Sequence, residues 1–226
     1  MLLAEARRAV ASAARELSRT GLAPGTSGNV SARDDDSGLI AITPSAVPYE
    51  ELDVADVAVV DAHGLLVEGR FAPSSETPMH TEVYARMPWV RGVTHTHSVY
   101  ATTFACLNRP IEAVHYLIAR VGERVPVAPY ATYGTPEIGR RAVESFDGNL
   151  AVLLQQHGVL TVGRSLDEAM TVAATVEYVA RVYHHALAIG RPVPLPRDEL
   201  RRLRAKLDGY KPTPVLDGET PPGRGS

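Results

Sequence analysis

The sequence predicts an α/β domain in which helices cover an antiparallel-rich sheet. Short apolar segments in the first third of the chain are paired across turn-forming clusters, which is typical of hairpins. Helical patterns lie between and after them, without the regular alternation of a βαβ array. The 226 residues are 45% apolar and 22% charged, which suits one globular domain with a sizeable core.

The N-terminal part is expected to form one helix and two hairpins. Residues 2–19 place apolar side chains at helical spacing, and Gly21 follows as a stop signal. Clusters of Asp, Ser and Gly then separate pairs of apolar segments, so these segments are expected to be antiparallel strands. The four strands are expected at residues 29–31, 39–42, 57–60 and 65–67.

The remainder of the chain is expected to mix helices with short strands. Glu76 opens a segment with helical spacing, and Ser74 and Ser75 before it are candidate N-caps. An apolar run beginning at residue 89 is expected to be a strand that ends at His95 and His97. The other helices are expected at residues 100–107, 136–146 and 165–189, and the other strands at 125–127, 150–155 and 158–162.

Composition excludes several classes of function. The net charge is −3 and the basic residues are dispersed among acidic ones, so a nucleic-acid partner is not expected. No apolar stretch reaches the ~18 residues of a membrane span, and the charged N-terminus does not resemble a signal peptide. We therefore expect a soluble, cytoplasmic protein that acts on a small molecule. The single cysteine, Cys106, excludes an internal disulfide and is expected to be buried.

Three histidines and a glutamate form the inventory of a metal site. His95 and His97 end one apolar run, and His157 ends another. Side chains two apart on a strand share a face, so two neighbouring strand ends could present three imidazoles to one point. Glu76, at a helix start, adds a carboxylate, and this donor set suits a mononuclear zinc site. The alternative is that each histidine is an ordinary surface or core residue.

Three loops beside strand ends gather small polar residues and glycine. Hydroxyls, an amide and backbone N–H groups suit a phosphate. No lysine of a nucleotide P-loop accompanies them, so ATP binding is not supported. Each loop alone is more often a turn, and the joint occurrence of all three beside Glu76 favours phosphate binding. The loops are residues 25–29, 43–46 and 73–75.

Taken together, five segments resemble the class II aldolase and adducin-head family, and within it the L-fuculose-1-phosphate aldolase branch. The resemblance runs in order through residues 1–210, which would form one catalytic domain, and leaves residues 211–226 as a Pro/Gly-rich tail. It implies a single three-layer domain with helices on both faces of the sheet. It also implies a homotetramer whose sites lie between subunits. The five segments are Gly25–Ser31, Ile42–Ser45, Pro73–Glu76, His95–Ser98 and Gln156–Gly158.

The resemblance assigns roles to the metal-site residues. His95, His97 and His157 would bind one Zn²⁺ per subunit, with Glu76 as a fourth ligand or a nearby acid/base. Tyr116 would cross from a neighbouring subunit as a proton donor. The activity implied is reversible cleavage of a ketose 1-phosphate, such as L-fuculose 1-phosphate, to dihydroxyacetone phosphate and an aldehyde through an enediolate.

The resemblance also assigns a substrate pocket, with two departures from the family pattern. Ala46 stands where many relatives have glycine, and its methyl group could crowd the approach of phosphate to the backbone. Gln156 stands where many relatives have other residues, and it receives no role. The phosphate-binding residues would be Gly28, Asn29, Ser45, Ala46, Ser74 and Ser75, and Tyr133 and Tyr210 would lie near the substrate.

Three other functions remain open from the sequence. An L-ribulose-5-phosphate 4-epimerase uses similar chemistry, but the segment His115–Leu117 differs from the pattern expected of that branch. A sugar-phosphate dehydratase could use the same metal and carboxylate. An adducin-head-like interaction module is the non-enzymatic alternative, and the presence of all three histidines argues against it.

Overall fold

The computed structural model describes residues 1–209. It contains an eight-stranded sheet in the order β4-β3-β2-β1-β5-β8-β7-β6. Neighbouring strands are antiparallel except for the parallel pair β6 and β7, which confirms the prediction of a mainly antiparallel sheet. The strands are β1 (Asn29–Arg33), β2 (Ile40–Ile42), β3 (Ala58–Val60), β4 (Leu66–Glu68), β5 (Gly92–Thr96), β6 (Val127–Ala128), β7 (Ala151–Leu154) and β8 (Gly158–Gly163).

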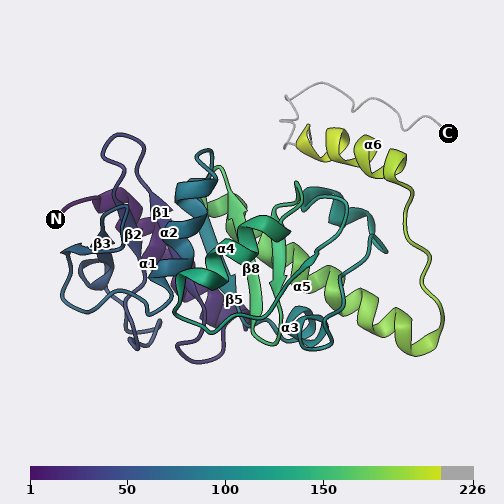
Figure 1. The fold of residues 1–226 in the computed structure, drawn as a ribbon, viewed down its shortest axis with the longest axis horizontal. Coiled ribbons are helices and arrows are strands. Elements are labelled where there is room, and N and C mark those ends of the chain that lie inside the picture. Colours follow the sequence, from purple (N-terminus) through teal and green to yellow (C-terminus); the bar gives the residue numbers. More distant parts are fainter. Residues whose placement is uncertain (210–226) are drawn as a thin grey trace, which may run out of the picture.

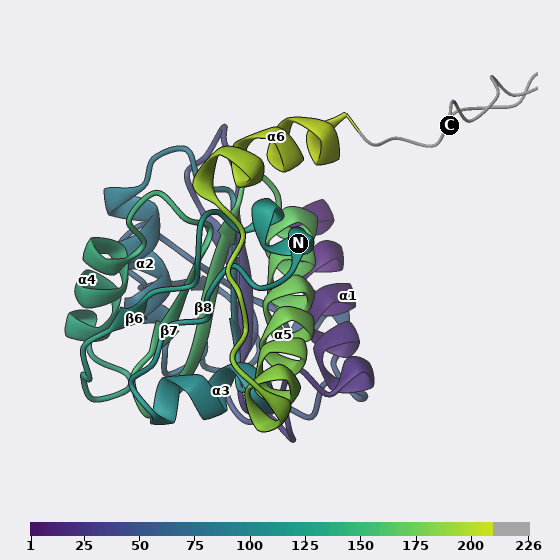
Figure 2. The same cartoon turned by 90° about the vertical axis from the view of Figure 1, so that its right-hand side faces the viewer.

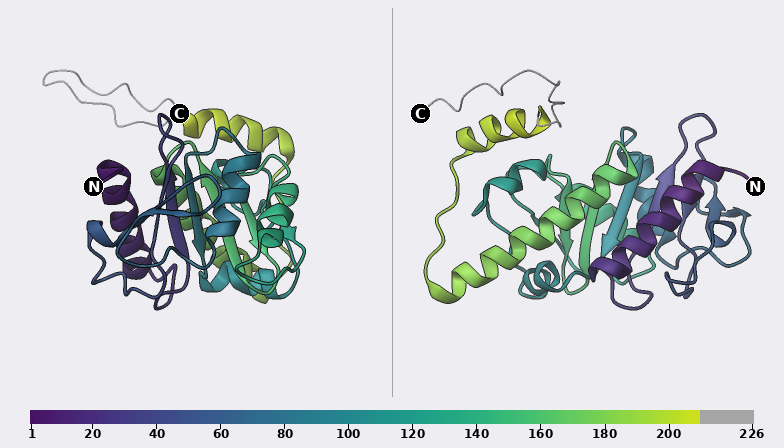
Figure 3. Two further views of the ribbon diagram at one scale, coloured as in Figure 1. Left: turned by 60° about the vertical axis from the view of Figure 1, so that its left-hand side comes forward. Right: turned by 180° about the vertical axis from the view of Figure 1, so that it is seen from behind.

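Helices cover both faces of the sheet, so the domain has the three layers expected (Figure 1). Figure 2 shows α2 and α4 on one side of the strands and α1 and α5 on the other. Figure 3, seen from behind, shows α1 and α5 side by side. The helices are α1 (Ala4–Thr20), α2 (Thr77–Arg86), α3 (Val99–Cys106), α4 (Pro136–Ser145), α5 (Leu166–Ile189) and α6 (Arg197–Asp208), with 3₁₀ turns η1 (Val54–Asp56) and η2 (Tyr116–Arg120).

The core lies on both faces of the sheet. Val152 and Leu154 of β7 join a buried cluster with α2 and α4, whereas Ala151 and Leu153 join a cluster with α3 and α5. Successive side chains on a strand point to opposite faces, and here both faces are covered. Strand β7 is therefore apolar along its whole length rather than alternating, which explains its short uninterrupted apolar run.

Several local predictions are wrong in detail. Glu76, rather than Ser74 or Ser75, is the N-cap residue of α2, and the Ser74 hydroxyl accepts the Glu76 backbone N–H at 3.2 Å. Cys106 is exposed, because it is the last residue of α3 and the buried face of that helix carries Ala101, Phe104 and Ala105. Helix α6 was not predicted, since most of its residues are charged and it packs through a few leucines against η2.

Among residues 1–209, no helix is both long enough and apolar enough to cross a membrane. The predicted tail at residues 211–226 and Tyr210 lie outside the described residues.

Candidate active site

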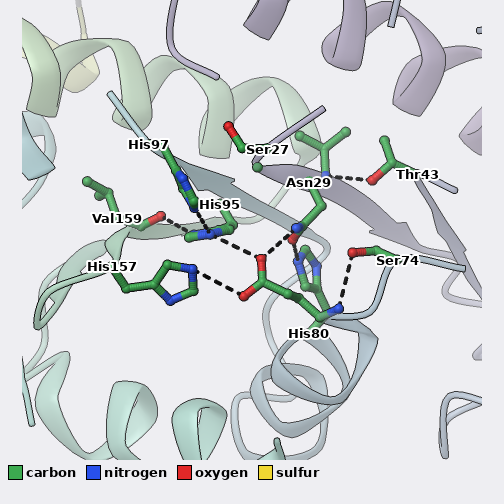
Figure 4. A network of polar contacts seen from close by, with 12 residues as sticks. Ser27, Asn29, Thr43, Ser74, His80, His95, His97, His157 and Val159 are labelled. Carbon is green, nitrogen blue, oxygen red and sulfur yellow. Dashed lines mark hydrogen bonds and ion pairs between the residues drawn. The ribbon is translucent and has the colours of Figure 1, made fainter. Parts of the chain in front are cut away.

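The four residues predicted for a metal site meet at one end of the sheet. Glu76 lies at the start of α2, His95 on β5, His97 directly after β5, and His157 in the turn between β7 and β8. Because β5 pairs with β8, this turn lies beside the end of β5. One ligand atom from each of the four residues lies within 4.8 Å of the others. Figure 4 shows the three imidazoles turned toward one another.

Two glycines allow the segments of the site to approach closely. A Cβ on Gly158 would lie 2.4 Å from the Thr96 carbonyl oxygen and 3.1 Å from both His95 and His97. A Cβ on Gly28 would lie 2.8 Å from the His95 carbonyl oxygen, and the φ of Gly28 is +79°. Both contacts are too short for any larger residue, so these glycines bring the His157 turn and the Gly28 loop against β5.

The hydrogen-bonding pattern directs a lone pair of His95 into the centre of the cluster. Its Nδ1 lies 2.9 Å from the carbonyl oxygen of Val159, which can only accept, so Nδ1 carries a hydrogen. In neutral His95 the lone pair is then on Nε2, which lies 3.2 Å from Glu76 Oε2 and 3.0 Å from His97 Nε2. A lone pair facing a carboxylate is unfavourable unless a positive charge lies between them. The cluster therefore requires a proton or a metal cation at its centre.

The pKa values of the four residues indicate which of them carry a proton in the absence of a metal. Burial raises the pKa of Glu76, but the charges of His95 and His157 and the hydrogen bonds from His95 and Asn29 outweigh burial and hold that pKa well below its usual range. Burial lowers the pKa of His95, but the nearby charge of Glu76 raises it above the usual value. Burial and the charge of His95 lower the pKa of His97 and of His157 to about 4. His97 and His157 are therefore neutral at pH 7 and able to bind a metal.

The donor set fits a divalent cation. Among the described residues, Glu76 Oε1 is buried without a hydrogen-bond partner, and the ring nitrogen of His157 that faces it, Nε2, lies 3.4 Å away. Native structures rarely leave buried polar atoms unsatisfied, and one explanation is an ion that binds between these two atoms. Three imidazoles and a carboxylate are ligands typical of zinc and related metals, although this set alone does not select one ion.

A cavity of about 470 Å³ opens over the cluster. All six residues predicted to bind phosphate line it. Within residues 1–209, the backbone N–H groups of Gly28, Ala46 and Ser75 have no hydrogen-bond acceptor, so they are available to an anion. Ala46 has a φ of +58°, a left-handed conformation in which glycine is usually found.

The predicted aromatic residues occupy different places. Tyr133 lines the cavity together with Tyr130. Tyr116 lies half-exposed on η2, beside α6, and is not among the residues that line this cavity. Tyr210 is outside the described residues. Gln156, which received no role from the sequence, lines the cavity beside His157 and has a φ of +56°.

The sequence analysis assigned Asn29 to phosphate binding and gave His80 no role, so it missed the support that these two residues give Glu76 from behind. Asn29 donates to Glu76 Oε2 at 2.8 Å, and His80 contacts the other end of the Asn29 amide at 2.6 Å. His80 follows Glu76 by four residues, and in a helix this spacing places both on one face. The signal available in the sequence was a histidine on the same helix face as Glu76.

Comparison with known proteins identifies the family. Residues 8–184 match the family described as "Class II Aldolase and Adducin N-terminal domain". The chain is 38% identical to a 5-deoxy-D-ribulose 1-phosphate aldolase of Bacillus thuringiensis serovar kurstaki, over 93% of this chain and 99% of the relative. It is 42% identical to an L-fuculose phosphate aldolase of Escherichia coli O6:H1, over 81% of this chain and 85% of the relative.

A solved structure agrees with these relatives. A protein described as L-fuculose 1-phosphate aldolase superposes with a TM-score of 0.88 at 38% identity, covering 92% of this chain and 98% of that one. Sequence, fold and the histidine–glutamate cluster thus point the same way, and the chain is an enzyme that belongs to the class II aldolase family.

Proposed function

We propose that this protein is a zinc-dependent aldolase that cleaves a short deoxyketose 1-phosphate to dihydroxyacetone phosphate and an aldehyde. One observation carries the proposal. The cluster of three imidazoles and a carboxylate requires a proton or a metal cation at its centre and has the ligands of a metal site, and it lies at the floor of a cavity whose wall carries three free backbone N–H donors. A site that combines a cation with an anion-binding loop suits a substrate with a phosphate and an oxygen-bearing carbon chain.

In this proposal His95, His97 and His157 hold the metal. The Val159 carbonyl fixes the tautomer of His95, as outer partners of ligating histidines commonly do. Neutral imidazoles leave the full charge of the ion for the substrate. When bound, a divalent ion would act as a Lewis acid that stabilises the enediolate of dihydroxyacetone phosphate.

Glu76 is the proposed acid/base. Its Oε2 is held by Asn29, whereas its Oε1 is buried without a hydrogen-bond partner among the described residues and lies 3.4 Å from His157 Nε2. In the cleavage direction, the C3–C4 bond breaks and its electron pair remains on the dihydroxyacetone phosphate fragment. Glu76 would deliver a proton to that fragment, and Tyr116 of a neighbouring subunit would take the proton of the hydroxyl that becomes the aldehyde oxygen. A homotetramer with sites between subunits is part of the same proposal.

The loops would position the substrate by its phosphate. The N–H groups of Gly28, Ala46 and Ser75 would donate to phosphate oxygens, together with the hydroxyls of Ser45 and Ser74. This contact supplies orientation rather than chemistry.

The names of the relatives narrow the substrate class. L-fuculose 1-phosphate and 5-deoxyribulose 1-phosphate both yield dihydroxyacetone phosphate when the C3–C4 bond breaks. Their aldehydes, lactaldehyde and acetaldehyde, differ by one CHOH unit. Selection between them would therefore depend on cavity residues that do not belong to the three phosphate loops, among them Tyr130 and Tyr133.

The test is a metal-controlled assay of both substrates. Purified protein would be stripped with a chelator, restored with Zn²⁺, and assayed for dihydroxyacetone phosphate release from each ketose phosphate. We expect the release of dihydroxyacetone phosphate to be lost completely when the metal is removed and to recover when Zn²⁺ is added. L-Ribulose 5-phosphate epimerisation is measured in parallel, and epimerisation without any release would replace the aldolase proposal. Unchanged release from metal-free protein would refute the metal role.

A further inference from the structure

A buried row of hydrogen bonds runs from Glu76 away from the cavity, into the layer between the sheet and α2. Asn29 Nδ2 lies 2.8 Å from Glu76 Oε2, and Asn29 Oδ1 lies 2.6 Å from His80 Nε2. His80 Nδ1 lies 2.6 Å from the Ser31 hydroxyl, which lies 2.8 Å from the Tyr84 hydroxyl. Figure 4 shows Asn29 beside the His80 ring. All five side chains are buried.

The direction of every bond in this row follows from the charge of Glu76. The carboxylate can only accept, so the Asn29 amide must turn its NH₂ group toward Glu76 and its oxygen toward His80. That oxygen must accept, so His80 carries its hydrogen on Nε2. The lone pair of His80 is then on Nδ1, and Ser31 must donate to it. Tyr84 in turn donates to Ser31, so all the donors point toward the active site.

The hydrogen-bond partners of His80 fix its tautomer and the orientation of its ring. Its side chain is fully buried, so no water replaces these partners. A neutral imidazole has one donor and one acceptor, and both are used here. A half-turn of the ring would place carbon atoms opposite both the Asn29 oxygen and the Ser31 hydroxyl, and the other tautomer would face the Asn29 oxygen with a lone pair, so both ring orientation and tautomer are fixed.

The helix closes this row into a ring. The His80 backbone N–H donates to the Glu76 backbone carbonyl oxygen, so the two residues are joined through α2 as well as through Asn29. The first turn of α2 and the start of β1 are thus tied together directly behind the carboxylate.

We propose that His80, supported by Ser31 and Tyr84, is a positioning residue that fixes the orientation of the Asn29 amide and through it the position of the Glu76 carboxylate. The inference rests on the proposed role of Glu76. An asparagine amide that turned over would present an oxygen to the carboxylate and push it from its place, so Asn29 needs a donor behind it. His80 is that donor.

A matched pair of variants tests the donor. In His80→Gln the amide nitrogen can reach the place of His80 Nε2 and still donate to Asn29, whereas in His80→Asn it reaches only the place of Nδ1. We expect His80→Asn to lower kcat about 10- to 100-fold, as loss of outer-shell partners commonly does, with little change in KM. His80→Gln should recover most of this loss. Equal losses in the two variants, or a loss confined to KM, would overturn the inference.

Stability controls separate positioning from folding. Val83→Ala removes buried apolar volume from the same helix without touching the row. It should lower the free energy of unfolding while leaving kcat per folded molecule unchanged. If His80→Asn unfolds, Tyr84→Phe and Ser31→Ala report on the same row, and their effects on kcat should decrease with distance from Glu76. A larger loss for Tyr84→Phe than for Ser31→Ala contradicts the proposed order.

A double-mutant cycle tests the path through Asn29, with a readout that does not require turnover. Zn²⁺ affinity, measured by chelator competition, and kcat are both compared for Asn29→Ala, His80→Asn and the double variant. If His80 acts through Asn29, adding His80→Asn to Asn29→Ala should change neither quantity more than about twofold. Fully additive losses overturn the inference. If the wild-type protein cleaves no ketose phosphate, the proposed function fails, and the affinity cycle still decides the role of His80.

Discussion

The two sides of Glu76 differ in how completely their polar atoms are paired. Toward the cavity, Glu76 Oε1 is buried without a hydrogen-bond partner among the described residues and lies 3.4 Å from His157 Nε2, and His95 Nε2 faces the other carboxylate oxygen at 3.2 Å. We call this the open side, defined as His95, His97, His157 and Glu76 Oε1. Toward the core, Asn29, His80, Ser31 and Tyr84 are joined in one row in which each side-chain N and O atom has a hydrogen-bond partner. We call these four residues the closed side.

This difference indicates that the open side binds a ligand and that the closed side holds Glu76 in place. Unpaired buried groups cost free energy, and a folded protein retains them where a ligand completes them. A fully paired buried network instead makes the local structure rigid and specific. Glu76 belongs to both sides, because one oxygen is fixed and the other is available. The proposed acid/base role of Glu76 would benefit from this combination, and changes on the two sides should have different consequences.

The largest effect is expected from Glu76→Gln. The amide keeps the size of the side chain but cannot carry a proton between groups, so kcat should fall by about 10²- to 10⁴-fold. Zn²⁺ should remain in part, since three histidines still bind it. Metal content by mass spectrometry and the rate of dihydroxyacetone phosphate release measure both quantities. Wild-type turnover in this variant would remove Glu76 from its proposed role.

The next effect concerns competition between protons and metal on the open side. The pKa of His95 is raised, so below that pKa a proton occupies the position that the metal needs. The pKa values of His97 and His157 are about 4, so these two residues are already neutral at pH 6. Zn²⁺ affinity should therefore increase about tenfold per pH unit between pH 6 and the pKa of His95, and then level off. A hundredfold change per unit would show that two histidines titrate together.

A chelator-buffered titration from pH 6 to 9 at constant ionic strength measures this slope. Glu76→Gln provides the matched control, because without the carboxylate charge the pKa of His95 should fall. The slope in that variant should become shallower over the same range. An unchanged slope would mean that another group supplies the proton.

Sequence patterns predicted most of the fold for clear physical reasons. Gly21 ends α1 in a left-handed conformation, and the apolar runs that end at His95 and His157 are strands buried on both faces. Helix α6 was missed because its pattern is dominated by charge, and its position depends on packing against η2. Cys106 was misplaced because the residue at a helix end can face solvent even within an apolar segment.

The sequence predicted the part of the site that is defined by residue type, the metal cluster. It did not predict the part that depends on how strands and helices are placed relative to one another. Three histidines and a glutamate at segment ends were enough to nominate the cluster. The closed side was not found, because Asn29 and His80 lie 51 positions apart in the chain and meet only through pairing of β1 with the sheet and packing of α2. Strand register and helix rotation, which no local pattern specifies, determine that contact.

A smaller effect, on stability, is expected from the closed side. Ser31→Ala would leave the Tyr84 hydroxyl and His80 Nδ1 buried without partners, which should cost about 1–3 kcal/mol. Tyr84→Phe removes one hydroxyl and leaves the Ser31–His80 bond, so it should cost about 0.5–1.5 kcal/mol. Urea unfolding measures both. Ser45→Ala, at the exposed cavity wall, should change stability by less than about 0.5 kcal/mol. A larger cost for Ser45→Ala than for Ser31→Ala would remove the distinction between the two sides.

The smallest effect is expected at Ala46, where strain lies beside the open side. A left-handed conformation costs a residue with a side chain about 1–2 kcal/mol, and Ala46 has a φ of +58°. Glycine removes this cost but increases the conformational freedom of the unfolded chain by about 0.5–1 kcal/mol, so Ala46→Gly should stabilise the protein by about 1 kcal/mol or less. Removal of the methyl group should also let phosphate approach the backbone N–H groups of this loop more closely. The inhibition constant of inorganic phosphate should therefore fall a few-fold. Ala72→Gly is the control, because Ala72 lies in the adjacent segment and its φ is not positive, so the same change should only destabilise. If both variants lose equal stability, Ala46 is unstrained and the loop is not held in a conformation that favours glycine.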